Sequence, residues 1–517
     1  MTLLVYGHAM LFNSYGFIFA FLPLTFLVYL GVGPYLPRRA ALGWLVLCSL
    51  FFYGWWNPAY LLLLVFSMVF NFLMGQVAGG RYSKSSAARK TGAVVGILVN
   101  LCLLGYFKYA NFFMDQIHAV FPVRFELAPI ILPLAISFFT FQQIAFLVDA
   151  YRGVAHEYHF VDYCLFVSFF PQLIAGPIVH HQEMMPQFVT ADRKFDPLNL
   201  SVGLSYFFIG LFKKVFLADN LARYATPVFE AARSGETLTL VEAWGGVLSY
   251  TFQIYFDFSG YSDMAIGIAW MIGIRLPVNF NSPYKAGNII EFWRRWHITL
   301  SRFLRDYLYI PLGGNRHGPG RRTTNVMITM LLGGLWHGAG WTFVVWGGLH
   351  GLFLAINHVW QRWRPGRDHP QDGGRAHPAG ICLTFLSVVV AWVFFRAESM
   401  DSVLRILEGM AGLNGVSLSD NLASTLNFLA GWGIRFNDTG SFDSHGLRWI
   451  VTAAVIVFAA PNSQEFMQRK NWVPAKGFAA RFPRWRPRFA SALFVAVLAI
   501  LSLLRLGEVS EFLYFQF

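Results

Sequence analysis

Two histidines in unusual surroundings are the residues of this chain best suited to chemistry. His297 ends the aromatic and basic run Glu291–His297, and His337 lies forty residues later in Leu335–Gly338, inside an apolar stretch. An ionisable group at membrane depth is costly and usually marks a pathway or a reaction. A neutral imidazole in a low-dielectric site can accept a proton from a hydroxyl group. The two histidines therefore predict acid–base chemistry inside a membrane protein.

Simpler roles remain open for each histidine. Glycines on both sides of His337 weaken a helix and let a ligand come close, but an interhelical hydrogen bond would also explain a buried imidazole. His297 could belong to an interfacial helix that Trp and Arg side chains anchor. His350, in Gly348–Gly351, has a similar but weaker context than His337.

The elements that must position these residues are membrane helices. The chain has 517 residues, 56% hydrophobic and 13% charged, with a mean hydropathy of +0.48. Soluble domains carry about 25% charged residues. Uncharged runs such as 11–33 are about as long as the roughly 20 apolar residues that one membrane span needs. We expect an all-α polytopic membrane protein, a single domain over 1–517 with roughly 11–13 membrane helices or re-entrant segments.

The segment 288–310 is predicted to form a basic amphipathic helix. Its apolar face carries residues at helical spacing: Trp293, Trp296, His297, Leu300, Phe303, Leu304 and Tyr307. Arginines lie largely off that face or just beyond the helix, and they are the candidate binding residues for an anionic donor that carries phosphates: Arg294, Arg295, Arg302, Arg305 and Arg316.

Basic clusters predict the topology. The positive-inside rule places clusters near Arg38, Arg81, Arg362 and 469–488 on the cytoplasmic side. Both termini and the polar segment 398–446 are then extracytoplasmic. The formal net charge of +13 reflects topology and lipid headgroup contact. Nucleic acid binding is disfavoured because the basic residues lie between membrane segments.

Other reactive side chains indicate no separate chemistry. Asp257 and Asp263 lie within apolar sequence, where pairing with Lys213, Lys214 or an arginine would let them shape the site. Four cysteines are scattered singly, without metal-ligand or redox spacing. The sequence contains no phosphate-binding P-loop and no Gly-x-Ser-x-Gly nucleophile motif, so a metal or covalent serine mechanism is not expected.

Several of these motifs together resemble the membrane-bound O-acyltransferase (MBOAT) family, and most closely its bacterial branch active in alginate O-acetylation. The similarity runs from about Phe12 to Ser399, with the core motifs in 165–360, and the ending 512–517 is also similar. The motifs that carry it are Phe169–Ile178, Tyr255–Met264, Asn279–Tyr284, Glu291–His297, Arg305–Arg316 and Leu335–Gly338. The Phe-Trp-x-Arg-Trp-His pattern also occurs in the related protein of teichoic acid D-alanylation.

The resemblance implies a fold with a central tunnel and an acetyl-CoA-dependent O-acyltransferase activity in the bacterial inner membrane. His337 corresponds to the family's invariant histidine and would deprotonate the acceptor hydroxyl, while His297 would orient a substrate or assist proton transfer. Further candidate binding residues are Trp336, His350, Asp257 and Asn281. Acetyl-CoA would be a substrate without a permanently bound cofactor. The acetyl group would reach a secreted polysaccharide, directly or through a periplasmic partner acyltransferase that could dock on the segment 398–446.

Two other functions stay open at this point. A transporter or flippase of a glycan or acylated substrate could use the buried histidines as a proton relay, although no internal repeat typical of many transporters is visible. A scaffold of a polysaccharide export complex would need neither histidine for chemistry. Within the enzyme hypothesis, the acceptor, which could be alginate, cellulose or another hydroxyl compound, the acyl chain length, the partner and the oligomeric state are not readable from the residues.

Overall fold

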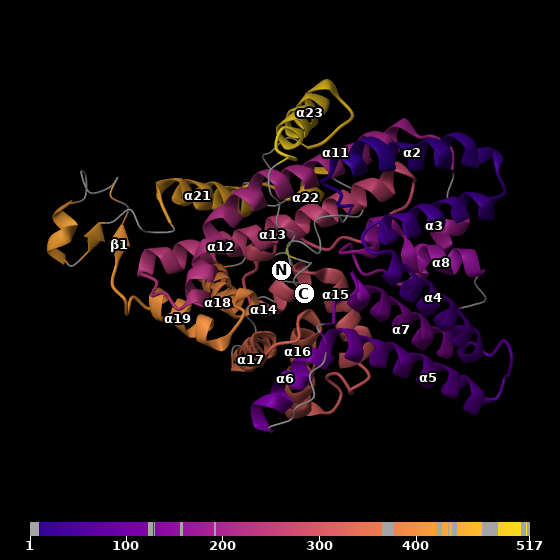
Figure 1. The fold of residues 1–517 in the computed structure, drawn as a ribbon, viewed down its shortest axis with the longest axis horizontal. Coiled ribbons are helices and arrows are strands. Elements are labelled where there is room, and N and C mark those ends of the chain that lie inside the picture. Colours follow the sequence, from indigo (N-terminus) through magenta and orange to yellow (C-terminus); the bar gives the residue numbers. More distant parts are fainter. Residues whose placement is uncertain are drawn as a thin grey trace. The chain divides into compact units, whose positions relative to one another are not determined.

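The structure is a computed structural model, and helices dominate it (Figure 1). It describes residues 10–121, 128, 130–155, 159–190, 193–363, 377–418, 420, 427–432, 434–436, 442–467, 484–507 and 513. The strands described are β1 (Ser417–Leu418) and β2 (Arg435–Phe436), which pair in parallel. The predicted all-α fold class is confirmed.

The chain forms two compact units. The first comprises Met1–Leu211, Tyr261–Val278 and Tyr514–Gln516, and the second comprises Phe212–Gly260, Asn279–Leu513 and Phe517. The boundary crosses α13 (Leu240–Met271), whose 32 residues reach about 48 Å at 1.5 Å per residue.

The first unit is a set of helices held together by small and polar residues. Its elements, in which η denotes 3₁₀- and π-helices, are η1 (Phe17–Phe21), α2 (Leu22–Phe26), η2 (Leu27–Val32), η3 (Gly33–Tyr35), α3 (Arg38–Gly54), α4 (Pro58–Ala78), α5 (Ser86–Leu104), η4 (Gly105–Tyr109), α6 (Ala110–Val120), α7 (Ile136–Tyr151), α8 (Phe160–Ser168), α9 (Phe170–Leu173), α10 (His181–Thr190) and α11 (Pro197–Phe212). Between α4 and α5, the buried Asn100 amide donates a 2.6 Å hydrogen bond to Asn71. Such interhelical amide bonds are typical of membrane bundles.

The second unit contains both candidate catalytic histidines. Its elements are η5 (Lys213–Ala218), α12 (Asp219–Ser234), the first part of α13, η6 (Pro283–Lys285), α14 (Ile289–Arg295), α15 (Ile298–Leu304), η7 (Arg305–Tyr309), α16 (Gly318–His337), α17 (Trp341–Trp363), α18 (Pro378–Arg396), α19 (Met400–Met410), β1, η10 (Asn427–Trp432), β2, α21 (Ser444–Ala459), α22 (Ser463–Met467) and α23 (Phe489–Leu503). Part of the predicted outer segment 398–446 lies outside the described residues.

Glycines let α16 and α17 pack closely. A Cβ atom on Gly334 would lie 2.2 Å from the carbonyl oxygen of Phe343, and one on Gly347 would lie 2.3 Å from that of Met330. Both distances are shorter than any van der Waals contact, so a larger residue would force the helices apart. This close approach positions the end of α16, where His337 lies.

Six helical segments among the described residues are long and apolar enough to cross a membrane. They are 17–35, 58–78, 86–120, 197–234, 341–363 and 378–396. The apolar helices Ser444–Ala459 and Phe489–Leu503 are shorter. These spans support a multi-pass membrane protein. The predicted number of roughly 11–13 segments counts short and re-entrant segments as well as full spans.

The segment 288–310 is not one continuous helix. It consists of α14, α15 and the π-helix η7. The helix is interrupted between α14 and α15, where His297 has a left-handed backbone with φ 42°. Backbone hydrogen bonds from Asn281 N to Arg295 O (2.9 Å) and from Ile298 N to Asn279 O (3.0 Å) hold the break in place. The helical spacing of apolar residues continues across the break, which is why the sequence pattern predicted a single helix.

Candidate active site

His297 lies at the break between α14 and α15 and is 1% exposed. Its Nδ1 atom is 3.1 Å from Oδ1 of Asn279, and Nε2 has no hydrogen-bond partner among the described residues. The ring packs edge-on against Phe258, with centroids 4.7 Å apart. The predicted placement of His297 with the apolar side chains is therefore confirmed.

His337 ends α16 and is 5% exposed. Its ring centroid is 6.5 Å from that of His297. Trp346 and Phe395 each have their ring centroid 5.1 Å from that of His337. Trp336 lies beside both histidines, at 4.9 Å from His337 and 6.3 Å from His297. The structure thus brings the two predicted catalytic histidines together with Trp336.

His350, on α17, joins the same aromatic cluster through Trp346. The Trp346 ring is 5.1 Å from His337 and 4.8 Å from His350. His350 is fully buried, and neither of its ring nitrogens has a hydrogen-bond partner among the described residues. The His350 ring also packs edge-on against Trp293, with ring centroids 5.1 Å apart.

Burial favours the uncharged form of the His297 imidazole. His297 lies outside the six candidate spans, and burial lowers its pKa from 6.5 to about 3. Desolvation disfavours the charged form of a buried histidine. The His297 ring is therefore neutral at physiological pH and can accept a hydrogen bond or a proton at Nε2.

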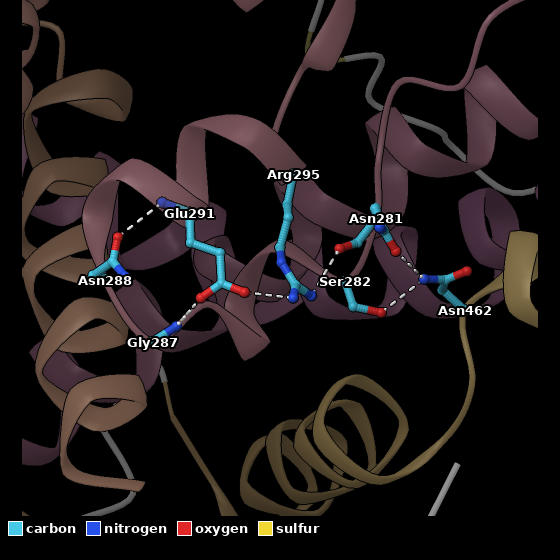
Figure 2. Close-up of polar contacts among 7 residues, drawn as sticks. All are labelled: Asn281, Ser282, Gly287, Asn288, Glu291, Arg295 and Asn462. Carbon is cyan, nitrogen blue, oxygen red and sulfur yellow. Dashed lines mark hydrogen bonds and ion pairs between the residues drawn. The ribbon is translucent and has the colours of Figure 1, made fainter. Parts of the chain in front are cut away.

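A chain of polar contacts holds the segment before His297 (Figure 2). Asn288 caps α14, because its Oδ1 accepts a 3.0 Å hydrogen bond from the Glu291 amide. The Glu291 carboxylate accepts a 2.7 Å bond from the Gly287 amide and forms an ion pair with Arg295. Arg295 Nη1 donates a 3.5 Å bond to the Asn281 carbonyl oxygen.

Asn462 extends this network from the turn between α21 and α22. Its Nδ2 donates to Asn281 Oδ1 at 3.0 Å and to Ser282 Oγ at 2.8 Å (Figure 2). Ser282 has a left-handed backbone with φ 46°, which is uncommon for a residue other than glycine. Asn281 therefore supports the loop before His297, and sequence analysis could not have paired it with a residue 181 positions away.

Two of the five predicted donor-binding arginines are engaged by carboxylates. Arg295 pairs with Glu291 inside the network of Figure 2. Arg305 donates a 2.7 Å hydrogen bond to Asp306, and both residues are largely at the surface. An arginine whose guanidinium group already binds a carboxylate has fewer N–H donors available for a phosphate.

The other three arginines differ in exposure. Arg294 and Arg316 are exposed, and Arg302 is half-buried. Asp257 is 1% exposed and pairs with Lys214 at 2.7 Å. Lys214 also pairs with Asp219 at 2.8 Å. Of the pairings left open for Asp257 in the sequence, the one with Lys214 is therefore observed.

Some residues of the site carried no assigned role in the sequence. Asn279 was visible only as part of the Asn279–Tyr284 motif, and its side chain touches His297. Trp346 and Phe395 flank His337, and only their aromatic type could have suggested this. No group of three metal-ligating side chains lies together in the part of the chain that the structure describes.

Comparison with known proteins gives the family context. Residues 52–395 match the model of the membrane-bound O-acyltransferase family, MBOAT. This range includes Asn279, His297, His337 and His350.

Several relatives are similar over much of their length. A peptidoglycan O-acetyltransferase from Helicobacter pylori is 44% identical over 502 residues, which cover 90% of this chain and 92% of the relative. A probable alginate O-acetylase from Pseudomonas aeruginosa is 42% identical over 416 residues, which cover 80% of this chain and 76% of the relative. A teichoic acid D-alanyltransferase from Streptococcus thermophilus is 29% identical over 286 residues, which cover 52% of this chain and 69% of the relative.

Proposed function

Because this chain belongs to the membrane-bound O-acyltransferase family, we propose that it transfers an acetyl group from cytoplasmic acetyl-CoA toward an exported glycan. The observation that carries the proposal is the pair of buried imidazoles of His297 and His337, with ring centroids 6.5 Å apart. Two relatives named for O-acetylation, one of peptidoglycan and one of alginate, support a glycan acceptor.

In the proposed reaction, His337 accepts the proton of the acceptor hydroxyl group. The hydroxyl oxygen then forms a bond to the acyl carbon of the thioester, and the carbon–sulfur bond breaks. The proton held by His337 passes to the leaving thiolate, so that the ring returns to its neutral state. His297 orients one of the two substrates through Nε2. General base assistance of this kind contributes about 10²–10⁴-fold to the rate, and positioning the two substrates contributes further.

The residues proposed to bind the acyl donor, acetyl-CoA, are chosen by their positive charge. Arg294 and Arg316 are exposed and suit the phosphates of acetyl-CoA. Arg295 and Arg305 are weaker candidates because each already has a carboxylate partner. We place these arginines on the cytoplasmic side of the bacterial inner membrane, and both chain termini on the extracytoplasmic side, by the positive-inside rule.

The acceptor of the acetyl group lies on the extracytoplasmic side in this proposal. The acetyl group reaches the glycan directly or through an extracytoplasmic partner acyltransferase, for which the segment 398–446 is the candidate docking surface. His350 and Trp336 line the same aromatic cluster as the two catalytic histidines and are proposed to contact a substrate.

The deciding experiment measures acetyl esters on the exported glycan of the host. Cells that carry His337→Ala are compared with wild type at matched levels of membrane-inserted protein. The exposed His118 provides a matched control as His118→Ala, for which unchanged acetylation is expected. Export of an unacetylated polymer by His337→Ala supports acyl transfer. Unchanged ester content would remove His337 as the base, and loss of the polymer itself would indicate the transport or scaffold function.

A further inference from the structure

The side chain of Asn279 makes an unusual set of contacts beside His297. Asn279 is fully buried, and its Oδ1 atom lies 3.3 Å from the Thr299 backbone nitrogen, 2.9 Å from Thr299 Oγ1 and 3.1 Å from His297 Nδ1. Three polar atoms thus converge on one atom of this amide.

The backbone nitrogen of Thr299 decides the first role. A backbone N–H can only donate, so the Asn279 atom that faces it must be the carbonyl oxygen and not the NH₂ group. A carbonyl oxygen can only accept, so His297 Nδ1 must donate and must carry a hydrogen. A neutral imidazole has a single N–H. The lone pair of His297 is therefore on Nε2, the buried nitrogen that has no hydrogen-bond partner among the described residues.

We propose that Asn279 is a positioning residue that fixes the Nδ1–H tautomer of His297, so that Nε2 accepts a hydrogen bond from a hydroxyl group of the acyl acceptor. This inference rests on the proposed function for the role of that hydrogen bond, but the tautomer itself does not depend on it. The opposite tautomer would direct a nitrogen lone pair at the Asn279 oxygen, and it would present an N–H to the acceptor hydroxyl.

The backbone around His297 supports the same role for Asn279. The left-handed conformation is unfavourable for a residue other than glycine and persists only where its surroundings hold it. Here the main-chain carbonyl oxygen of Asn279 accepts a 3.0 Å hydrogen bond from the backbone amide of Ile298, the residue directly after His297. Asn279 thus holds His297 by both its main chain and its side chain. The rings that flank His297 are those of Phe258, Trp336 and His337, and His337 is the titratable one.

The first test observes the tautomer directly. Nitrogen-15 NMR of the full-length protein, labelled at histidine, distinguishes protonated from unprotonated ring nitrogens, and the signals that disappear in His297→Gln assign those of His297. We expect a protonated Nδ1 and an unprotonated Nε2. A proton on Nε2 would overturn the proposal whether or not His297 matters for acyl transfer.

The second test compares two substitutions of Asn279. Asn279→Leu has a similar size but no acceptor, and we expect loss of the fixed tautomer and a fall in acetyl transfer of about tenfold or more, part of the 10²–10⁴-fold that acid–base groups contribute. Asn279→Asp keeps an acceptor oxygen, and we expect it to retain the Nδ1–H tautomer and measurable transfer. Its activity should be lost at a higher pH than in wild type as the pH is lowered, because a neighbouring carboxylate stabilises the imidazolium form.

A control variant separates the role of Asn279 from a general effect on folding. Asn100→Leu removes a buried, hydrogen-bonded amide from the first unit, and we expect unchanged transfer per folded molecule. Equal losses in Asn279→Leu and Asn279→Asp with no change in pH dependence would overturn the proposal, as would near-normal transfer by Asn279→Leu. Full activity of His297→Gln would instead refute the proposed role of His297, while the NMR result would still stand.

Discussion

At the scale of single residues, the proposed chemistry depends on two imidazoles buried in one aromatic cluster. His297 and His337 are both more than nine-tenths buried and lie among aromatic rings. A low-dielectric environment keeps an imidazole uncharged and so keeps its lone pair available. The same burial would make a protonated ring costly.

A conservative substitution tests His337 as the base. His337→Gln keeps a polar side chain of similar size but cannot accept and release a proton near neutral pH. We expect acetyl transfer to fall by about 10²–10⁴-fold while the protein stays folded. The measurement is transfer of radiolabelled acetyl groups in purified membranes, with His118→Gln as the control. A fall of less than about threefold, far below that range, would assign proton transfer to another residue.

The pKa of His297 predicts how stability depends on pH. The unfolded state binds a proton below about pH 6.5, whereas the folded state stays neutral down to about pH 3. The contribution of His297 to stability is therefore complete above pH 6.5 and is lost as the pH falls toward 3. Between about pH 7.5 and pH 5 the loss is about 2 kcal/mol, because the slope approaches about 1.36 kcal/mol per pH unit below the unfolded-state pKa.

Thermal unfolding in detergent measures this effect. The melting temperature of wild type should fall more steeply between pH 7 and pH 5 than that of His297→Gln. Parallel pH profiles for the two proteins would mean that His297 is not held in its neutral form.

At the scale of elements, close packing and a polar network decide where the histidines lie. The end of α16 is positioned by its contact with α17, which requires glycine at 334 and 347. The segment before His297 is held by Glu291, Arg295 and Asn462 (Figure 2).

Neighbouring glycines on α17 test the helix contact. Gly347→Ala places a Cβ atom 2.3 Å from the Met330 carbonyl oxygen, so we expect a lower melting temperature and reduced transfer. Gly348→Ala brings its Cβ atom no closer than 3.5 Å to Leu331 Cδ2, an ordinary contact, and should be neutral or slightly stabilising. Equal melting temperatures for the two variants would show that α16 and α17 are not tightly packed at Gly347.

The Glu291–Arg295 pair tests the polar network. Glu291→Gln removes the ion pair and weakens the contact to the Gly287 amide, and we expect a loss of about 1–3 kcal/mol in unfolding free energy together with reduced transfer. The matched control is Asp306→Asn, which removes a more exposed ion pair to Arg305 and should cost at most about 1 kcal/mol. Similar stability of the two variants would contradict a structural role for the network.

At the scale of the whole molecule, the apolar spans and the basic clusters predict how the chain lies in the membrane. The exposed residues Ser85 and His445 fall on opposite predicted sides. In a cysteine-free background, Ser85→Cys should react with a membrane-impermeant maleimide only after the inner membrane is opened, and His445→Cys should react in intact spheroplasts. The reverse pattern would show that the topology is inverted. The arginines proposed to bind acetyl-CoA would then lie on the extracytoplasmic side, away from cytoplasmic acetyl-CoA.

The sequence by itself determined the membrane class, the family resemblance and the two central histidines. These follow from local properties, namely long uncharged runs, clustered motifs and ionisable residues in apolar surroundings. Only the tertiary structure decided that His297 lies at a break between two helices, that Asn281 binds Asn462 and that Asp257 pairs with Lys214. It also decided that Asn279 contacts His297. The reason is physical: a helical pattern specifies which side of a helix is apolar, whereas partners distant in sequence are set by how the helices pack.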